Sequence, residues 1–123
     1  MGSHRSNGKI LLNAWRARTV VPAFNIPYLP MMEPIVRALR DTKSFGLIAV
    51  ARLEWVKFEA GSLEAVRDEY ERVKDPRFTG LHLDHVPVID EDNEEVDFEE
   101  VIRLAIQAGY GSVMVDGSRL PLD

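Results

Sequence analysis

The sequence contains no cysteine. This absence excludes disulfide bonds, thiolate metal sites and cysteine nucleophiles, and it is typical of a cytoplasmic protein. No apolar run approaches the roughly 18–20 residues of a membrane-spanning helix, and no secretory signal is recognisable. The sequence also lacks G-x-G-x-x-G, P-loop and G-x-S-x-G elements, which removes the simplest nucleotide-binding and serine-hydrolase interpretations. With 123 residues, 46% of them hydrophobic and 28% charged, we expect one soluble, globular domain.

The chain has no excess of basic charge either, since its formal net charge is -5. Eight acidic residues lie between Asp90 and Glu100, and outside this segment 15 basic residues stand against 12 acidic ones. We therefore expect no nucleic-acid partner and no membrane. An EF-hand calcium loop is excluded, because the sixth and twelfth positions from Asp90 are Glu95 and Val101. A solvated loop that leads into the acidic first turn of a helix explains the segment.

Hydrophobic patterns predict strands that alternate with helices. Residues 1–5 are interpreted as a tag remnant, so the predicted domain covers residues 6–123. Helical periodicity is present over 6–15, 30–41, 62–73 and 97–109, and compact apolar runs typical of buried strands cover 19–26, 45–51, 78–85 and 112–116. Pro22 is unfavourable inside the first of these strands because it lacks a backbone donor. The alternation predicts an α/β fold with a parallel sheet.

Two architectures fit four such units. One is a small doubly wound sheet, and the other is the first half of a TIM (β/α)8 barrel, which takes about 250 residues. Only Gly117–Asp123 follow the last predicted strand, without the helix that would cover it. We therefore expect the chain to form about half of a barrel whose other half lies outside it.

Every predicted strand ends in polar residues, and parallel sheets bind their ligands at the carboxyl ends of the strands. The residues at these ends are Asn25, Arg52, Glu54, His82, Asp84, His85, Asp116 and Ser118. Asn, Asp and Ser are also ordinary turn residues, but four polar strand ends together favour a functional site.

The densest group is His82-Leu-Asp-His85. Side chains alternate along a strand, so His82 and Asp84 share one face and His85 points away. His82 is best explained as a packed, hydrogen-bonded histidine, whereas Asp84 and His85 at the strand tip could converge as an acid/base and a metal ligand. A catalytic zinc usually takes three protein ligands, and this chain has three histidines in all, one of them in the tag remnant. We expect the missing ligands to lie outside the chain.

Three segments, in this order, resemble the signatures of class II (metal-dependent) fructose-bisphosphate aldolases and their tagatose-bisphosphate relatives. They are Val21-Pro-Ala-Phe-Asn-Ile26, Leu81-His-Leu-Asp-His85 and Ser112-Val-Met-Val-Asp-Gly-Ser-Arg-Leu-Pro121. The resemblance runs from about residue 7 to the end of the chain. It covers the amino-terminal half of the family's (β/α)8 barrel.

The resemblance implies a zinc-dependent lyase that reversibly cleaves fructose 1,6-bisphosphate to dihydroxyacetone phosphate and glyceraldehyde 3-phosphate, as in glycolysis. Asp84 would be the catalytic acid/base and His85 the first zinc ligand, with Asn25, Asp116, Ser118 and Arg52 near the substrate or behind the metal. It also implies a cytoplasmic homo-oligomer, a dimer or a tetramer, and no activity for these 123 residues alone.

One segment departs from the family pattern. After the second strand the family commonly has small and hydroxyl residues, including a serine that contacts a substrate phosphate, whereas this chain has Ala51-Arg-Leu-Glu-Trp-Val-Lys57. Arg52 could bind an anion through a bidentate contact, close the site or pair with Glu54. The alternatives are therefore a different sugar phosphate, such as tagatose bisphosphate, and a non-catalytic half-barrel that associates with a copy of itself or with another half.

Overall fold

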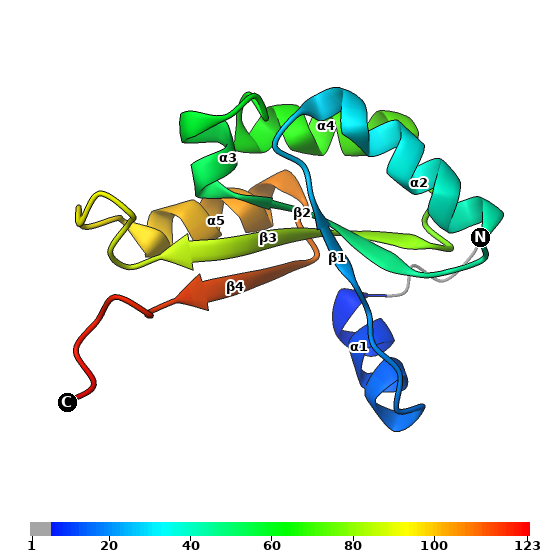
Figure 1. Ribbon diagram of the computed structural model, residues 1–123, viewed down its shortest axis with the longest axis horizontal. Coiled ribbons are helices and arrows are strands. Elements are labelled where there is room, and N and C mark those ends of the chain that lie inside the picture. The colour runs from blue at the N-terminus through cyan, green and yellow to red at the C-terminus, as the bar shows by residue number, and fades with distance from the viewer. Residues whose placement is uncertain (1–5) are drawn as a thin grey trace.

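The computed structural model describes residues 6–123 and contains four strands, each reached through a helical segment (Figure 1). In chain order the elements are α1 (Asn7–Arg16), β1 (Ala23–Asn25), the 3-10 helix η1 (Leu29–Met31), α2 (Met32–Asp41), β2 (Gly46–Ala51), α3 (Arg52–Lys57), α4 (Leu63–Val73), β3 (Thr79–Pro87), α5 (Phe98–Ala108) and β4 (Ser112–Asp116). None of the helices in this part of the chain has the length and apolar composition to cross a bilayer.

The four strands form one parallel sheet in the order β1-β2-β3-β4. Helices α2, α4 and α5 pack on one face of it, against register partners such as Ile48 with Leu81 and Val50 with Leu83. A doubly wound sheet has helices on both faces and a reversal in strand order, whereas consecutive units of a (β/α)8 barrel have neither. The chain therefore has the fold of about half a TIM barrel, as the sequence predicts.

The core lies between the sheet and these three helices. Each helix contributes an apolar stripe, for example Met32, Val36 and Leu39 from α2, and every residue of β2 is buried. The outer strands are less covered, so that Phe24 of β1 and Val115 of β4 are partly exposed.

The opposite face of the sheet would line the inside of a complete barrel. Helix α1 lies against this side, at the amino-terminal ends of the strands (Figure 1). Ser6 caps its amino-terminal end, where the Ser6 hydroxyl accepts a hydrogen bond from the Lys9 amide. Its first residue, Asn7, is buried and donates hydrogen bonds to the Leu81 carbonyl and the Ser112 hydroxyl.

Three details differ from the sequence predictions. Strand β1 covers only residues 23–25 of the predicted 19–26, and Pro22 lies just before it, where its carbonyl still accepts a hydrogen bond from the Leu47 amide. Strand β3 extends to Pro87, two residues beyond the predicted end. Helix α3 was not predicted, because six residues are too few to show helical periodicity. The tag prediction for residues 1–5 lies outside the described residues.

Candidate functional site

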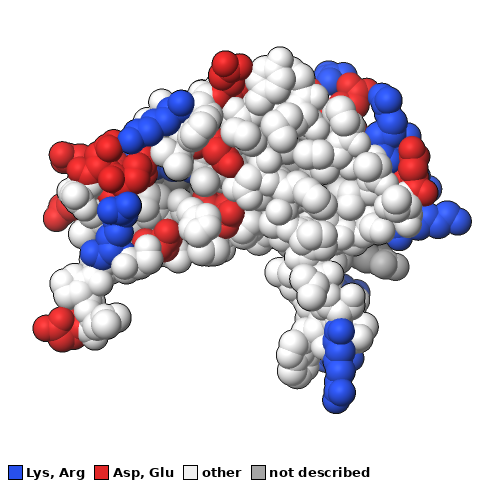
Figure 2. Space-filling model, in the orientation of Figure 1, with Lys and Arg blue, Asp and Glu red and all other residues white. Residues whose placement is uncertain are grey.

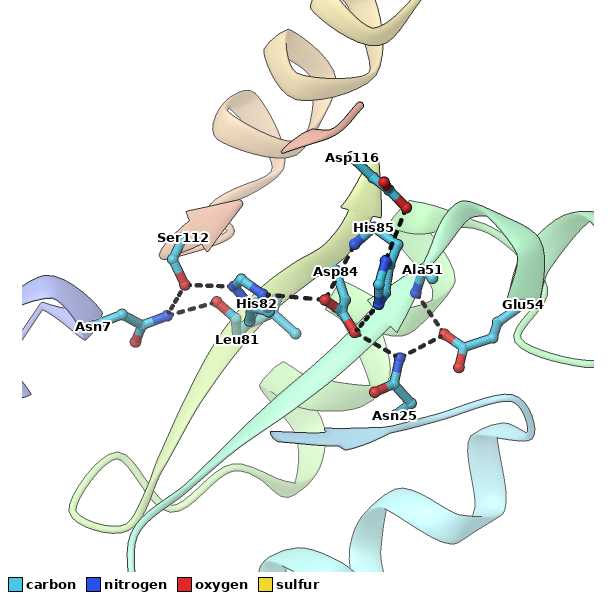
Figure 3. A network of polar contacts seen from close by, with 10 residues as sticks. All are labelled: Asn7, Asn25, Ala51, Glu54, Leu81, His82, Asp84, His85, Ser112 and Asp116. Atoms are coloured by element: carbon cyan, nitrogen blue, oxygen red, sulfur yellow. Dashed lines mark hydrogen bonds and ion pairs between the residues drawn. The ribbon is translucent and has the colours of Figure 1, made fainter. Parts of the chain in front are cut away.

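Side chains from three strands and one short helix meet at the carboxyl edge of the sheet (Figure 3). A cleft of about 360 Å³ opens there. Its lining includes four of the predicted site residues and two further acidic residues, namely Asn25, His85, Asp116 and Ser118 with Glu54 and Glu91.

A bulge in β3 brings Asp84 and His85 together. Leu83 pairs with Val113 and Val86 with Val115, so that Asp84 and His85 on β3 lie opposite Met114 alone. His85 has a φ of 40°, in the left-handed region that residues other than glycine seldom adopt. Strict alternation predicts that His85 points away from Asp84, and the bulge makes that prediction wrong. The ring of His85 instead lies beside Asp84 and Asp116 (Figure 3).

Asp116 fixes one nitrogen of the His85 ring. Three donors, the Ser118 hydroxyl, the Ser118 backbone amide and the His85 ring, lower the pKa of Asp116 to about 2, so its carboxylate is ionised and accepts only. The 3.1 Å contact between His85 Nδ1 and Asp116 Oδ2 is therefore a hydrogen bond that Nδ1–H donates. In the neutral form of the ring, the lone pair is then on the other nitrogen, Nε2.

This arrangement suits a metal ligand. His85 Nε2 lies 3.8 Å from Asp84 Oδ2, too far for a hydrogen bond, and the His85 side chain is 56% exposed. Metal-binding histidines usually donate the other ring N–H to a carboxylate, as His85 does to Asp116. The described residues thus offer one imidazole ligand at the strand ends, fewer than a catalytic zinc needs.

Both oxygens of the Asp84 carboxylate are held. The His85 backbone amide donates to Oδ1 over 3.1 Å, and the Asn25 side-chain amide donates to Oδ2 over 3.2 Å. The Asp84 side chain is 15% exposed and lies beside His85, although it is not among the residues that line the cleft. A carboxylate with a fixed orientation next to a cleft is suited to moving a proton.

Glu54 is a buried acidic residue of this site, and its arrangement was not predicted from the sequence. One of its oxygens, Oε2, accepts the backbone N–H of Ala51 and lies 3.5 Å from Asn25 Nδ2. Burial raises the pKa of Glu54, although the hydrogen bonds from Ala51 and Asn25 act in the opposite direction. A glutamate three residues after a buried strand end was the available signal, but only the fold shows that it turns inward.

His82 lies deeper in the sheet, and its Nε2 is 3.7 Å from Asp84 Oδ1 (Figure 3). Its Nδ1 is 2.8 Å from the Ser112 hydroxyl, which in turn accepts a hydrogen bond from Asn7. Burial lowers the pKa of His82, which favours the neutral ring. The expectation of a packed, hydrogen-bonded histidine is confirmed. Asn7, whose position in the first turn of α1 gave no signal, is the residue of this network that the sequence analysis missed.

Arg52 pairs with an acidic loop rather than with Glu54. Its guanidinium lies 3.3 Å from the buried Asp90, and it does not line the cleft. Asp90, Glu91 and Asp92 are close enough together to suggest a metal site. The contacts of this loop explain the cluster without one, because Asp90 accepts backbone amides within its own turn and Lys57 pairs with both neighbours. Figure 2 shows acidic and basic side chains side by side at this end of the molecule.

Comparisons with known proteins agree with this geometry. A family model described as fructose-bisphosphate aldolase class-II matches residues 5–123. The D-tagatose-1,6-bisphosphate aldolase subunit GatY of Klebsiella oxytoca is 30% identical over 118 residues, which is 96% of this chain. The match covers 38% of that relative, so the chain spans well under half of its length.

Proposed function

Since the chain belongs to the class II fructose-bisphosphate aldolase family, we propose that it supplies the acid/base and one metal ligand of a ketose-bisphosphate aldolase. In this proposal residues 6–123 are the amino-terminal half of the barrel. The remaining metal ligands and most phosphate contacts come from outside these 123 residues, and the complete protein is a cytoplasmic homo-oligomer.

The observation that carries the proposal is the convergence at the bulge in β3. Asp84 and His85 are neighbours in sequence, yet their side chains lie together, with His85 lining the cleft and Asp84 Oδ2 3.8 Å from its Nε2. Asn25 and Asp116 fix them from the first and fourth strands. His85 takes its left-handed backbone conformation inside a strand rather than at a turn, and this conformation brings its ring beside Asp84.

Asp84 is the acid/base of the proposed reaction. In the cleavage direction its carboxylate takes the proton of the substrate hydroxyl that becomes the aldehyde, the adjacent carbon–carbon bond breaks, and the bonding electrons move toward the ketone. Asn25 and the His85 amide hold the carboxylate in place for this transfer. In the condensation direction Asp84 returns the proton to the new hydroxyl.

His85 would hold a divalent metal ion, zinc in our proposal, through Nε2, and the bound metal would polarise the ketone carbonyl as a Lewis acid. Asp116 keeps the Nδ1 proton in place, so Nε2 stays available as a ligand. Ser118 supports this arrangement by donating its backbone amide to Asp116.

The substrate is a phosphorylated ketose, either fructose 1,6-bisphosphate or tagatose 1,6-bisphosphate. The similarity to a tagatose-bisphosphate aldolase subunit supports tagatose 1,6-bisphosphate. The match to the fructose-bisphosphate aldolase family supports fructose 1,6-bisphosphate to the same degree. Arg52 is a weaker candidate for a phosphate ligand than its sequence position implies, because Asp90 already neutralises its charge.

The test is a substrate panel on the complete protein that carries this chain. The protein is stripped of metal with a chelator and assayed for cleavage of both ketose bisphosphates with and without added zinc. We expect cleavage of at least one sugar that is lost on stripping and restored by zinc. No cleavage of either sugar by the zinc-loaded protein would refute the proposal.

A further inference from the structure

We infer that Glu54 is a positioning residue of this site: its carboxylate holds the Asn25 side chain so that the amide nitrogen, not the amide oxygen, faces Asp84. The inference deepens the proposed function and rests on it for the role of Asp84. It concerns a residue at which the sequence departs from the family pattern.

The geometry starts from the Asn25 amide nitrogen, which lies between two carboxylates. Nδ2 is 3.2 Å from Asp84 Oδ2 and 3.5 Å from Glu54 Oε2. An asparagine side chain can present either its NH₂ group or its oxygen to a neighbour, and the two faces differ by a rotation about one bond. Two acceptors on the same side select the NH₂ group, whose two protons can serve one carboxylate each.

Glu54 is itself anchored to the strand beside Asp84. The backbone amide that it accepts belongs to Ala51, the last residue of β2, and Ala51 is the register partner of Asp84 on β3. Glu54 is only 9% exposed and is the third residue of α3. Its side chain reaches back to the residue that precedes the helix, as the glutamate of a capping box does. The Ala51 amide that anchors Glu54 therefore lies at the same level of the sheet as Asp84.

Asn25 needs an anchor because its own strand is short and open on one side. Strand β1 has three residues and pairs only with β2 in the described part of the chain. No side-chain hydrogen bond of Asn25 other than those to Glu54 and Asp84 is found within residues 6–123. Without Glu54, Asp84 is the one remaining acceptor among these contacts, and the amide loses the second hydrogen bond that fixes its orientation.

Burial and charge support the same conclusion. A carboxylate is expensive to bury, and burial raises the pKa of Glu54 even though two donors offset part of the effect. The contact with the Ala51 amide is that of a capping box, in which glutamate or glutamine is preferred at the third helical position. The same oxygen also lies 3.5 Å from Asn25 Nδ2, so one carboxylate serves both donors.

The first test is a double-mutant cycle on the complete, zinc-loaded protein. We expect Glu54→Ala to lower kcat about tenfold, in line with the loss of one hydrogen bond to a charged group, with KM changed less than about twofold. Glu54→Gln keeps an acceptor oxygen and should stay close to the parent. If Glu54 acts through Asn25, adding Glu54→Ala to Asn25→Ala lowers kcat no further. Additive losses would overturn the inference.

The second test does not depend on activity. In the metal-free, ¹⁵N-labelled complete protein, the side-chain amide signals of Asn25 should shift in Glu54→Ala and stay near their parental positions in Glu54→Gln. Glu64→Ala, an exposed glutamate in the first turn of α4, serves as the matched control and should leave them unchanged. If the Asn25 signals do not shift in Glu54→Ala, the inference is overturned, even when the protein is an active aldolase. Signals that shift in a protein without cleavage refute the proposed reaction and leave the contact standing.

Discussion

At the scale of single residues, the site depends on hydrogen bonds that assign a fixed role to each titratable group. Asp116 accepts from His85, Asn25 donates to Asp84, and Ser112 faces the ring of His82. These three contacts join three strands, β1, β3 and β4, that are far apart in the sequence. Each can be broken by a nearly isosteric substitution, so the residue scale offers the sharpest predictions.

Asp116→Asn should weaken metal binding through His85. Asparagine can turn its NH₂ group toward Nδ1, which removes the acceptor that keeps Nε2 free. Loss of such a supporting carboxylate typically reduces metal affinity by about 10- to 100-fold, and we expect that range for zinc, measured by competition with a chelating dye.

Asp92→Asn is the matched control, because its carboxylate belongs to the acidic loop and pairs with Lys57. It should leave the zinc affinity unchanged. The opposite pattern, a loss with Asp92→Asn and none with Asp116→Asn, would move the metal from the strand ends to the loop.

His82 should make the stability of the fold depend on pH. Its pKa in the folded state is lowered by burial, below the value of about 6.5 for an unfolded chain. The unfolded state therefore binds more protons in the interval between the two values, and the stabilisation that is present above pH 6.5 is lost as the pH falls through the folded pKa.

The measurement is urea unfolding of the parent chain and His82→Asn from pH 8 to pH 5. The difference in their free energies of unfolding should be constant above pH 7 and shrink below pH 6.5. A difference that stays constant over the whole range would contradict a buried, neutral His82.

At the scale of elements, most of the fold follows from the sequence and the exceptions have local causes. Apolar runs and helical periodicity locate four strands and four of the five α-helices, because these patterns report which face of each element is buried. Helix α3 is too short to be periodic, and the β3 bulge is an extra residue that leaves no compositional mark.

The predicted site residues fall into two groups, those whose position follows from the strand order and those whose position depends on a loop or a short helix. Asn25, Asp84, His85 and Asp116 meet because parallel strands end at one edge, which a sequence can indicate. The partners of Arg52 depend on how the β3–α5 loop folds back, and the arrangement of Glu54 depends on α3. Neither follows from strand order alone.

The packing of α1 against the sheet, through Asn7, gives a prediction at the scale of elements. A methyl group on Gly80 would overlap the buried Asn7 side chain, and nearby Gly111 leaves similar room for it. We expect Gly80→Ala to destabilise the fold by about 1–3 kcal/mol, as overpacking of a tight site does.

Gly8→Ala is the control substitution, because nothing lies within 4 Å of the added carbon and alanine favours the helix. Its stability should equal or exceed that of the parent in thermal unfolding. Equal effects of the two substitutions would show that α1 is not seated at Gly80.

At the scale of the whole molecule, the sheet is open at both sides. Strands β1 and β4 each have a partner on one side only among the described residues, and the site has one imidazole ligand where a catalytic zinc takes three. The catalytic unit in our account is thus larger than these 123 residues.

We therefore expect the isolated 123-residue chain to show no ketose-bisphosphate cleavage, with or without zinc. Activity measured across fractions of a sedimentation run would detect any competent species. Turnover in the monomer fraction would contradict this expectation, whereas turnover confined to a larger species would mean that copies of the chain complete the site.

The central claim is that Asp84 moves the proton during carbon–carbon bond cleavage. The most direct measurement compares zinc-dependent kcat of the complete protein with those of Asp84→Asn and of Asp68→Asn, an exposed aspartate on α4. Loss of a general acid/base costs about 10²- to 10⁴-fold, so we predict a fall of that size for Asp84→Asn, with bound zinc retained, and none for Asp68→Asn. A parental kcat in Asp84→Asn would contradict the account.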